Sequence, residues 1–172
     1  KATGMLKIIW FLLGVSTAAF AGIYSGGNGI KADPYQITTP ADWIEFTDTP
    51  GDWSCYFILT NDIDLEALPS LKPVAGDTNP NQSGFQGTIF QGKFNGAGHR
   101  IINVTISQDS RVGVGLFGCT GPNSQILNLG VINAAITGDE RVGGLAGIFS
   151  YGQIANCYVT GSVQENIKTG GL

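Results

Sequence analysis

The sequence is poor in the residue types on which most catalytic and nucleic-acid-binding proteins depend. It has 9 lysines and arginines, 13 aspartates and glutamates and 1 histidine, for a formal net charge of −4 at pH 7. Phosphate binding needs clustered lysine and arginine, and no such cluster occurs, so the chain is a poor partner for nucleic acid. With His99 alone, it also lacks the paired histidines of an HExxH zinc protease.

Cysteine is scarce and irregularly spaced. Cys55, Cys119 and Cys157 are an odd number, and none belongs to a CxxC pair. One histidine and three scattered cysteines match no structural zinc pattern. In an oxidising compartment Cys119 and Cys157 are the pair that we consider for a disulfide. We favour the alternative, in which all three are small buried apolar side chains.

A hydrophobic run near the N-terminus is too short to cross a bilayer. Lys7 precedes an apolar stretch over residues 8–15, whereas a membrane span needs about 20 apolar residues. Ala19-Phe20-Ala21 matches the small-x-small cleavage pattern of exported proteins. We therefore predict a signal peptide over residues 1–21, cleaved near Ala21. The mature chain is expected to be secreted or displayed at the cell surface, without a membrane span.

Glycine, in contrast, is abundant and recurs in a repeated motif. The chain has 26 glycines, which suit short strands joined by tight turns. Residues 112–118 are echoed at 142–147, and Thr169 begins a third copy. The leucines of the three copies lie 29 and 27 residues apart, a period typical of solenoids and arrays. The residues shared by the two complete copies are Gly115, Leu116, Gly118, Gly144, Leu145 and Gly147.

The period has a simple geometric explanation. Three short strands and three turns use about 28 residues in one circuit of the chain, here called a rung, and successive rungs stack at about 4.8 Å. Each strand then pairs in parallel with its copy in the next rung. The sequence therefore predicts an all-β fold, a parallel β-solenoid or β-helix. We expect it to be truncated at its C-terminal end, because the third copy stops at Leu172.

A second echo places asparagine among apolar residues. We align Ile102, Val104 and Ile106 with Leu127, Leu129 and Val131, and then with Ala155, Cys157 and Val159, as inward-facing positions. This alignment stacks Asn103, Asn128 and Asn156 in one ladder, with amides hydrogen-bonded along the solenoid axis. The alternative for Asn103-Val104-Thr105 is an N-glycosylation acceptor.

The segment before the repeats resembles a cap. Thr39 is a suitable helix N-cap, Pro40 suits the first helical position, and Asp42 favours the positive end of the helix. A solenoid needs such an element because its first rung otherwise exposes an unpaired strand edge. We expect an N-terminal cap over residues 22–55 and the solenoid over 56–172.

The repeats and three segments upstream of them are similar to those of a known protein family. The chain resembles the GLUG-motif proteins in Gly115-Leu116-Phe117-Gly118 and Gly144-Leu145-Ala146-Gly147. It also resembles the leader region of that family at 33–37, 57–65 and 94–101. The resemblance implies a right-handed parallel β-solenoid of bacterial surface or secreted proteins, including filamentous-haemagglutinin-like adhesins. Similar repeats occur as accessory regions of immunoglobulin A-specific metallopeptidases, and the family supplies no catalytic residues.

Few side chains offer chemistry beyond this scaffold. Asp62 and Asp64 are the candidates for a calcium site, because alternating carboxylates can begin an oxygen cage; solvated acids at a strand end are the alternative. Trp43 and Trp53 suit either sugar stacking or packing against the first rung. Glycoside hydrolysis needs a facing pair of carboxylates, which the sequence does not place in a recognisable cleft.

The expected function is therefore structural. We predict an exported adhesive scaffold without catalysis in this segment, whose variable loops, such as residues 66–84, contact surface glycans or host and matrix proteins. The alternative is an accessory spacer or glycan-binding region of a larger secreted enzyme, either a metallopeptidase or a polysaccharide-degrading one. An open final rung also predicts that the fragment self-associates through that end.

Overall fold

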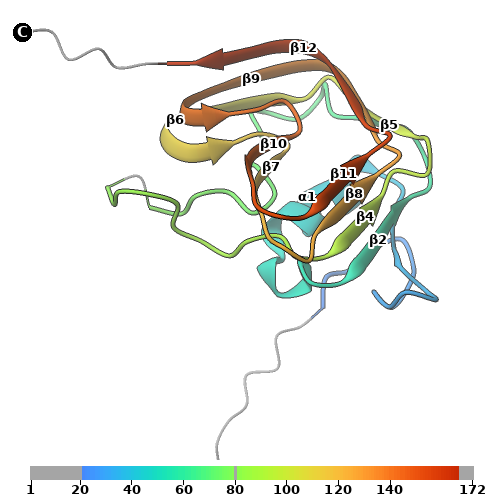
Figure 1. The fold of residues 1–172 in the computed structure, drawn as a ribbon. Coiled ribbons are helices and arrows are strands. Elements are labelled where there is room, and N and C mark those ends of the chain that lie inside the picture. The colour runs from blue at the N-terminus through green and yellow to red at the C-terminus, as the bar shows by residue number, and fades with distance from the viewer. Residues whose placement is uncertain (1–20, 80, 167–172) are drawn as a thin grey trace, which may run out of the picture.

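The computed structural model describes residues 21–79 and 81–166, in which strands predominate and one short α-helix occurs (Figure 1). The predicted signal peptide, except for Ala21, and the third copy of the motif from Thr169 onward lie outside the described residues. No helix within those residues is long and apolar enough to cross a membrane. The elements are β1 (Tyr35–Ile37), α1 (Pro40–Asp48), the 3-10 helix η1 (Pro50–Asp52), β2 (Tyr56–Leu59), β3 (Ile63–Asp64), β4 (Lys93–Asn95), β5 (Arg100–Ile102), β6 (Thr105–Val114), β7 (Phe117–Thr120), β8 (Gln125–Leu127), β9 (Gly130–Val142), β10 (Ala146–Phe149), β11 (Gln153–Ala155) and β12 (Tyr158–Glu165).

Every pairing between these strands is parallel. One sheet has the order β1-β2-β4-β8-β11, a second pairs β7 with β10, and a third has the order β12-β9-β5-β3, with β6 also beside β9. Each sheet is thus built from strands of successive passes of the chain. Figure 1 looks along the stack and shows these passes as superimposed loops. The predicted all-β class and parallel pairing are confirmed.

The predicted alignment of the second echo was right in one step and wrong in the other. Leu127 pairs with Ala155 and Val131 with Val159, as predicted, but residues 102–106 do not align with residues 127–131. Ile101 pairs with Val131, whereas Ile126 pairs with Phe94. The reason is the Gly96-Ala97-Gly98 turn between β4 and β5, which is longer than the corresponding turn between β8 and β9. The true counterpart of β8 is therefore β4, and β5 is the counterpart of the start of β9.

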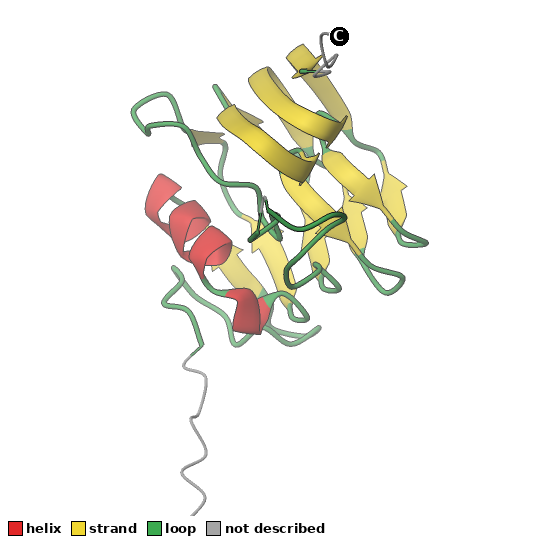
Figure 2. Cartoon of the chain, turned by 90° about the vertical axis from the view of Figure 1, so that its left-hand side faces the viewer, coloured by secondary structure: helices red, strands yellow, loops and turns green. Residues whose placement is uncertain are grey.

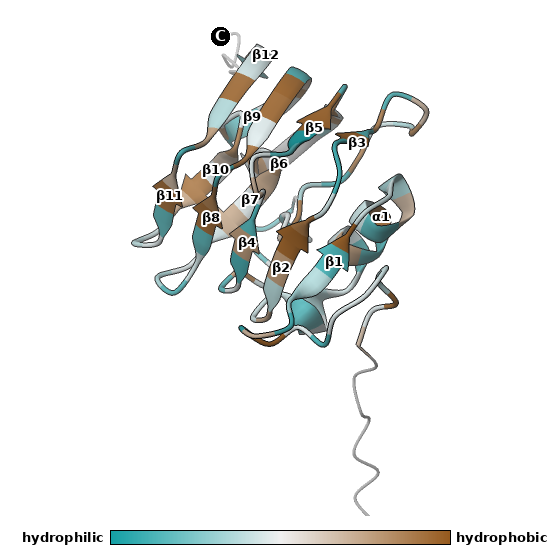
Figure 3. Cartoon of the chain, turned by 90° about the vertical axis from the view of Figure 1, so that its right-hand side faces the viewer, coloured by the Kyte–Doolittle hydropathy of each residue, from teal (hydrophilic) through white to brown (hydrophobic). Residues whose placement is uncertain are grey.

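The burial pattern changes accordingly. Ile101 and Ile126 are fully buried, whereas Ile102 and Leu127, which the sequence placed inside, are only half-buried. Alternate residues of a strand face opposite sides, so Ile102 and Leu127 were assigned to the wrong face. The other predicted inward positions of these segments are buried as expected: Val104, Ile106, Leu129 and Val131. Figure 3 shows hydrophobic residues alternating with hydrophilic ones along the stacked strands.

The predicted N-terminal helix is confirmed as α1. Thr39 is its N-cap, and its hydroxyl accepts a hydrogen bond from the Asp42 amide at 3.2 Å. The Asp42 carboxylate accepts in return from the Thr39 amide at 2.8 Å, which completes a capping box. The same carboxylate oxygen accepts from the Ser25 hydroxyl at 2.8 Å and from the Thr38 amide at 3.0 Å. Asp42 thus joins the leading segment, β1 and α1.

Helix α1 lies beside the β1 end of the stack, away from β12 (Figures 2 and 3). Its Phe46 is fully buried and packs against the rings of Phe57, Phe94 and Phe117, with centroid distances of 4.4, 5.6 and 6.2 Å. Because these rings come from β2, β4 and β7, a single helical side chain contacts strands of more than one sheet. Such aromatic contacts contribute about 0.5–1.5 kcal/mol each beyond burial.

The stability of this end is expected to depend on the charge of Asp42. Burial raises the pKa of Asp42, but the hydrogen bonds from Ser25, Thr38 and Thr39 outweigh burial and hold it below its usual range. A depressed pKa stabilises the fold above the unfolded-state value of about 3.9, and the stabilisation is lost as pH falls through the folded-state value. Asp42→Asn should lower the free energy of unfolding by about 1–2 kcal/mol at pH 7 and weaken the loss of stability below pH 4.

Urea unfolding between pH 7 and pH 3 measures both effects. Asp48→Asn is the matched control, because Asp48 lies on the same helix and makes only an exposed 3.4 Å ion pair with Lys72. The control should change stability by less than about 0.5 kcal/mol. An identical pH dependence for the wild type and Asp42→Asn would contradict the assignment.

Candidate functional site: stacked turns and polar columns

The glycine-leucine motif forms the corner that leads into β7 and β10. Leu116 is 1% exposed, and the Phe117 amide donates to the Leu145 carbonyl at 2.8 Å. Phe117 pairs with Ala146, which places Gly118 level with Gly147. Leu145 is half-buried and packs against the same core. The two motifs therefore occupy equivalent positions in neighbouring rungs.

The motif glycines lie where backbones meet. A Cβ atom on Gly118 would approach the carbonyl oxygens of Ala75 and Gly113 to 2.5 and 2.9 Å, and one on Gly115 would lie 2.7 Å from the Gly143 oxygen. Gly144 and Gly147 are similarly confined, by the Val159 side chain and by the backbone of Val114. The motif thus combines a core leucine with glycines that admit close backbone contact.

A column of asparagine side chains runs along one corner of the stack. The Asn156 amide donates to the Asn128 oxygen at 3.0 Å, and the Asn128 amide donates to the Asn95 oxygen at 3.0 Å. Asn128 and Asn156 both have a positive φ, of 53° and 55°. Asparagine is among the few residues that tolerate this left-handed conformation. Residue type is thus constrained by backbone conformation as well as by hydrogen bonding.

Asn103 belongs to a different column, so its predicted place beside Asn128 and Asn156 was wrong. Its amide donates to the Asp64 carboxylate at 2.9 Å, and its oxygen accepts from the Asn133 amide at 3.2 Å. The shift of register described above is the cause, since residue 103 aligns with residue 133 once β5 is paired with β9. Residues 21–79 and 81–166 therefore contain two polar columns.

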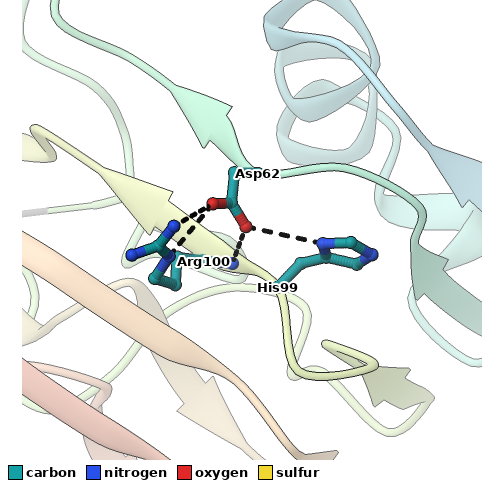
Figure 4. Close-up of polar contacts among 3 residues, drawn as sticks. All are labelled: Asp62, His99 and Arg100. Carbon is teal, nitrogen blue, oxygen red and sulfur yellow. Dashed lines mark hydrogen bonds and ion pairs between the residues drawn. The ribbon is translucent and has the colours of Figure 1, made fainter.

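A compact polar cluster links β3 to β5 (Figure 4). The Arg100 guanidinium donates to the Asp62 carboxylate at 2.5 and 3.0 Å, and the Arg100 backbone amide donates at 2.9 Å. The His99 Nδ1 atom lies 3.4 Å from the same carboxylate. Hydrogen bonds from Arg100 hold the pKa of Asp62 below its usual range. A carboxylate stabilised in this way is a weak base, which disfavours a role in general base catalysis.

Both candidate calcium ligands already have protein partners. Asp62 binds Arg100, and Asp64 accepts from the Glu66 amide at 3.0 Å as well as from Asn103. The Glu66 and Asn103 hydrogen bonds lower the pKa of Asp64. Within residues 21–79 and 81–166, no group of three or more histidine, cysteine, aspartate or glutamate side chains is arranged to hold a metal ion. The carboxylates serve as hydrogen-bond acceptors between rungs.

A cleft of about 470 Å³ lies between the end of α1 and the long loop after β3. It is lined by Thr47, Asp48, Pro50, Trp53, Lys72, Pro73, Gly76, Asp77, Thr78 and Gln108. The Asp77 carboxylate accepts from the Asn79 and Gln86 amides, both at 3.1 Å, and from the Val112 amide of β6 at 3.3 Å. These hydrogen bonds fix the loop as one wall of the cleft.

The two candidate sugar-stacking tryptophans are core residues. Trp43 is 1% exposed and packs against Phe46 and Phe94. Trp53 is 6% exposed, and its indole nitrogen donates to the Phe46 carbonyl at 2.7 Å. Stacking on a sugar needs an accessible ring face, and burial leaves neither ring such a face. Of the two expected alternatives, packing is the one observed.

The three cysteines are free thiols. Cys119 is buried, and Cys55 and Cys157 are half-buried. Burial raises the pKa of each thiol, which lowers the fraction of reactive thiolate at neutral pH. The Cys119–Cys157 disulfide that the sequence left open is not formed. Only Cys119 is a fully buried side chain as expected, and the Cys157 thiol donates to the carbonyls of Ile126 and Ala155 at 3.4 and 3.3 Å.

These features define a class of protein: stacked parallel strands with a glycine-leucine corner and polar columns repeated from rung to rung. Residues 138–164 match the family model described as "The GLUG motif". Residues 138–164 thus carry a GLUG motif, as the resemblance predicted. The matched segment spans the second motif, β10, β11 and most of β12.

Two curated relatives are glycine-rich or mucin-like by name. The chain is 34% identical over 162 residues to Halomucin of Haloquadratum walsbyi, covering 90% of this chain and 2% of that protein. It is 32% identical over 149 residues to a protein of Evansella cellulosilytica provisionally named Gly-rich membrane protein, covering 82% of this chain and 16% of that protein. The chain thus spans only a small part of both relatives.

A solved structure shares the fold. It is provisionally described as an immunoglobulin A1 protease from Bacteroides ovatus, and it superimposes with a TM-score of 0.56 and 22% identity. The match covers 80% of this chain and 40% of that one. At this level of identity the similarity concerns the fold alone.

Sequence reasoning missed three residues that complete the polar columns and the cluster. Asn95 begins the first column and Asn133 extends the second. Both were missed because the sequence alignment paired residues 102–106 with 127–131 instead of pairing β4 with β8 and β5 with β9. Arg100 was seen only as part of the family leader region, although it is the main partner of Asp62. A useful signal was available, because Asn103 and Asn133 follow Ile102 and Ile132 in the same Ile-Asn pair.

The asparagine columns predict unequal effects of two neighbouring substitutions. Asn128→Ala should lower the free energy of unfolding by about 1–3 kcal/mol, because it removes two column hydrogen bonds and places alanine at a positive φ. Asn128→Gly, which keeps the backbone conformation, separates the hydrogen bonds from the strain. Gln125→Ala, at the start of β8, should cost less than either. Equal melting temperatures for Asn128→Ala and Gln125→Ala would refute the column's contribution.

The close backbone contact at Gly118 predicts a second effect. Gly118→Ala should destabilise the fold by about 1–3 kcal/mol, because the added methyl group meets carbonyl oxygens on two sides. Gly26→Ala is the matched control, since its nearest neighbour is the flexible end of the Gln36 side chain at 3.1 Å. Denaturant unfolding of both variants measures the difference. Equal stabilities would show that β7 can move away from its neighbours.

Proposed function

We propose that this chain is a right-handed parallel β-solenoid that acts as a structural, adhesive scaffold of a secreted or cell-surface protein. The observation that carries the proposal is the parallel register of β1, β2, β4, β8 and β11, which runs through five successive passes of the chain. Repeats that contact only their neighbours form elongated structures whose stability grows with each added unit. The handedness follows the strong preference of parallel crossover connections.

The division of the chain supports a scaffold with a defined start. We propose residues 1–21 as a signal peptide, 22–55 as a cap and 56–172 as the repeat region. In support, α1 packs Phe46 against rings from later rungs, and β1 supplies the first strand of a five-stranded sheet. A cap of this kind protects the first rung from pairing with other chains.

The names of the relatives support a location outside the cell. One is a mucin by name and the other a membrane protein, and neither name is that of an enzyme. The polar groups that the sequence offered for chemistry, Asp62, Asp64 and the asparagines, are engaged in contacts between rungs. This distribution suits a scaffold, with surface glycans or host and matrix proteins as the partners of its loops.

A second candidate function rests on the cleft beside α1. Its lining combines Asp48, Lys72 and Gln108 with the apolar surfaces of Pro50 and Pro73, and its volume lies within the range of small-ligand sites. Carboxylate, ammonium and amide groups beside apolar surface suit a saccharide. The fold shared with a structure described as a protease fits such a module attached to a larger enzyme.

Surface labelling in cells tests the scaffold proposal. Bacteria producing this protein should expose Lys31, Lys72 and Lys93 to a membrane-impermeant amine reagent, and label should appear in peptides from these residues without cell lysis. A cytoplasmic protein of the same strain is the control. Labelling only after lysis would overturn the surface assignment, whereas glycan binding abolished by Lys72→Ala and Gln108→Ala would establish the second function.

A further inference from the structure

The residues that follow the proposed cleavage point are held by carboxylates from α1 and η1. The Gly22 amide donates to the Asp52 Oδ2 atom at 2.8 Å, and the Ile23 amide donates to the Glu45 Oε1 atom at 3.2 Å. The Tyr24 hydroxyl donates to the same Asp52 oxygen at 3.1 Å. The backbone position at which the proposed mature chain begins therefore faces two acidic side chains.

Packing against the first strands fixes the position of Gly22. The Tyr24 ring lies against the rings of Tyr35 in β1 and Phe57 in β2, with centroid distances of 4.5 and 5.7 Å. A Cβ atom on Gly22 would lie 2.8 Å from the Tyr24 ring, so glycine permits this close approach. Asp52 is only 6% exposed. A backbone nitrogen and a buried carboxylate are thus held side by side by the fold.

The two carboxylates lack a cationic partner among the described residues. Within residues 21–79 and 81–166, neither Asp52 nor Glu45 forms an ion pair with a lysine, arginine or histidine side chain. Their negative charge acts on the hydroxyl beside them: burial is the main cause that raises the pKa of Tyr24, followed by the charge and hydrogen bond of Asp52 and the charge of Glu45. A buried carboxylate is stabilised by an opposite charge within hydrogen-bond distance. A positive charge at the Gly22 nitrogen is therefore favoured.

We propose that Asp52, with Glu45 beside it, is a binding site for the amino terminus that cleavage after Ala21 creates. In this hydrolysis water breaks the Ala21–Gly22 peptide bond: its oxygen completes the Ala21 carboxylate, and its two hydrogens convert the Gly22 N–H into an ammonium group. A neutral amide that donates one hydrogen bond thus becomes a cation with three donors, next to Asp52. Cleavage therefore strengthens the attachment of the leading segment to α1 and η1. The inference rests on the signal peptide proposed above.

Two polypeptides that differ by one residue test the site. Residues 22–172 carry the amine on Gly22, whereas residues 21–172 carry it one position further from Asp52, on the exposed Ala21. Both start at the required residue once the initiator methionine is removed, which mass spectrometry verifies. At pH 7 the 22–172 polypeptide should melt at least about 3 °C higher. Asp52→Asn should abolish this difference, and the control Asp48→Asn, an exposed change on α1, should retain it.

The difference should also follow the titration of an amine. Pairing with a carboxylate raises the folded-state pKa of an amino terminus above its unfolded value of about 7.7–8.0. The advantage of the 22–172 polypeptide should therefore be complete below that range and disappear as pH rises through the folded-state pKa. The titratable groups around this position are Asp52, Glu45 and Tyr24, with Tyr35 and Cys55 also close to Asp52. Burial and then the Asp52 charge raise the pKa of both Tyr35 and Cys55, and both polypeptides contain all five groups.

Equal melting temperatures of the two polypeptides at pH 7, or a difference that persists in Asp52→Asn, would overturn the proposal. Near-UV circular dichroism of the buried Trp43 and Trp53 verifies that each variant is folded. If Asp52→Asn does not fold, the wild-type pair decides, because a difference unchanged between pH 7 and pH 10 contradicts an ion pair of the amine. N-terminal sequencing of the exported protein reports separately on cleavage. A chain that begins at Gly22 without the stability difference would remove the binding site and leave the proposed export and scaffold role unaffected.

Discussion

Parallel stacking in register is the constraint on which the rest of this structure depends. Each strand finds its backbone hydrogen-bond partners in the same strand of the next rung, so one rung dictates the path of its neighbour. Residues that share a position in successive rungs must then tolerate each other's contact. This requirement explains why apolar side chains lie over apolar ones, as Phe94 does over Ile126. It also explains why amides stack head to tail at the corners.

Because strands pair with the next rung, the first and last rungs each have strand edges without a partner rung, and the two ends of the stack differ in how these edges are covered. Inside the stack, β-strands of two neighbouring rungs satisfy each other, but a terminal rung lacks one neighbour. At the β1 end, helix α1 covers the first rung, and its Phe46 and Trp43 side chains are buried in the core. At the β12 end no corresponding element occurs among the described residues, and apolar side chains remain exposed. Within the described residues, the first and last rungs therefore differ in how their apolar side chains are covered.

The charged and polar side chains considered above form hydrogen bonds and ion pairs between rungs. Asp62 is bound by Arg100, Asp64 by Asn103, and the cysteines are partly or fully buried. An ion pair at the surface contributes little stability by itself, but here it joins two positions that are also linked through β3 and β5. A long loop lies beside α1, and Asp77 fixes it to β6. Binding functions in repeat proteins commonly reside in such loops.

The sequence by itself determined the class of fold, the start of α1 and the motif that names the family, because these depend on local preferences. Thr39, Pro40 and Asp42 define a helix start from three adjacent positions, and the glycine-leucine motif recurs at a fixed period. Only the tertiary structure decided which Asn residues share a column. Two extra residues in the Gly96-Ala97-Gly98 turn shift the register, and a shift of this kind is visible only when β5 and β9 lie side by side. The pairing of Asp62 with Arg100 was likewise decided by stacking, since the two residues are 38 positions apart.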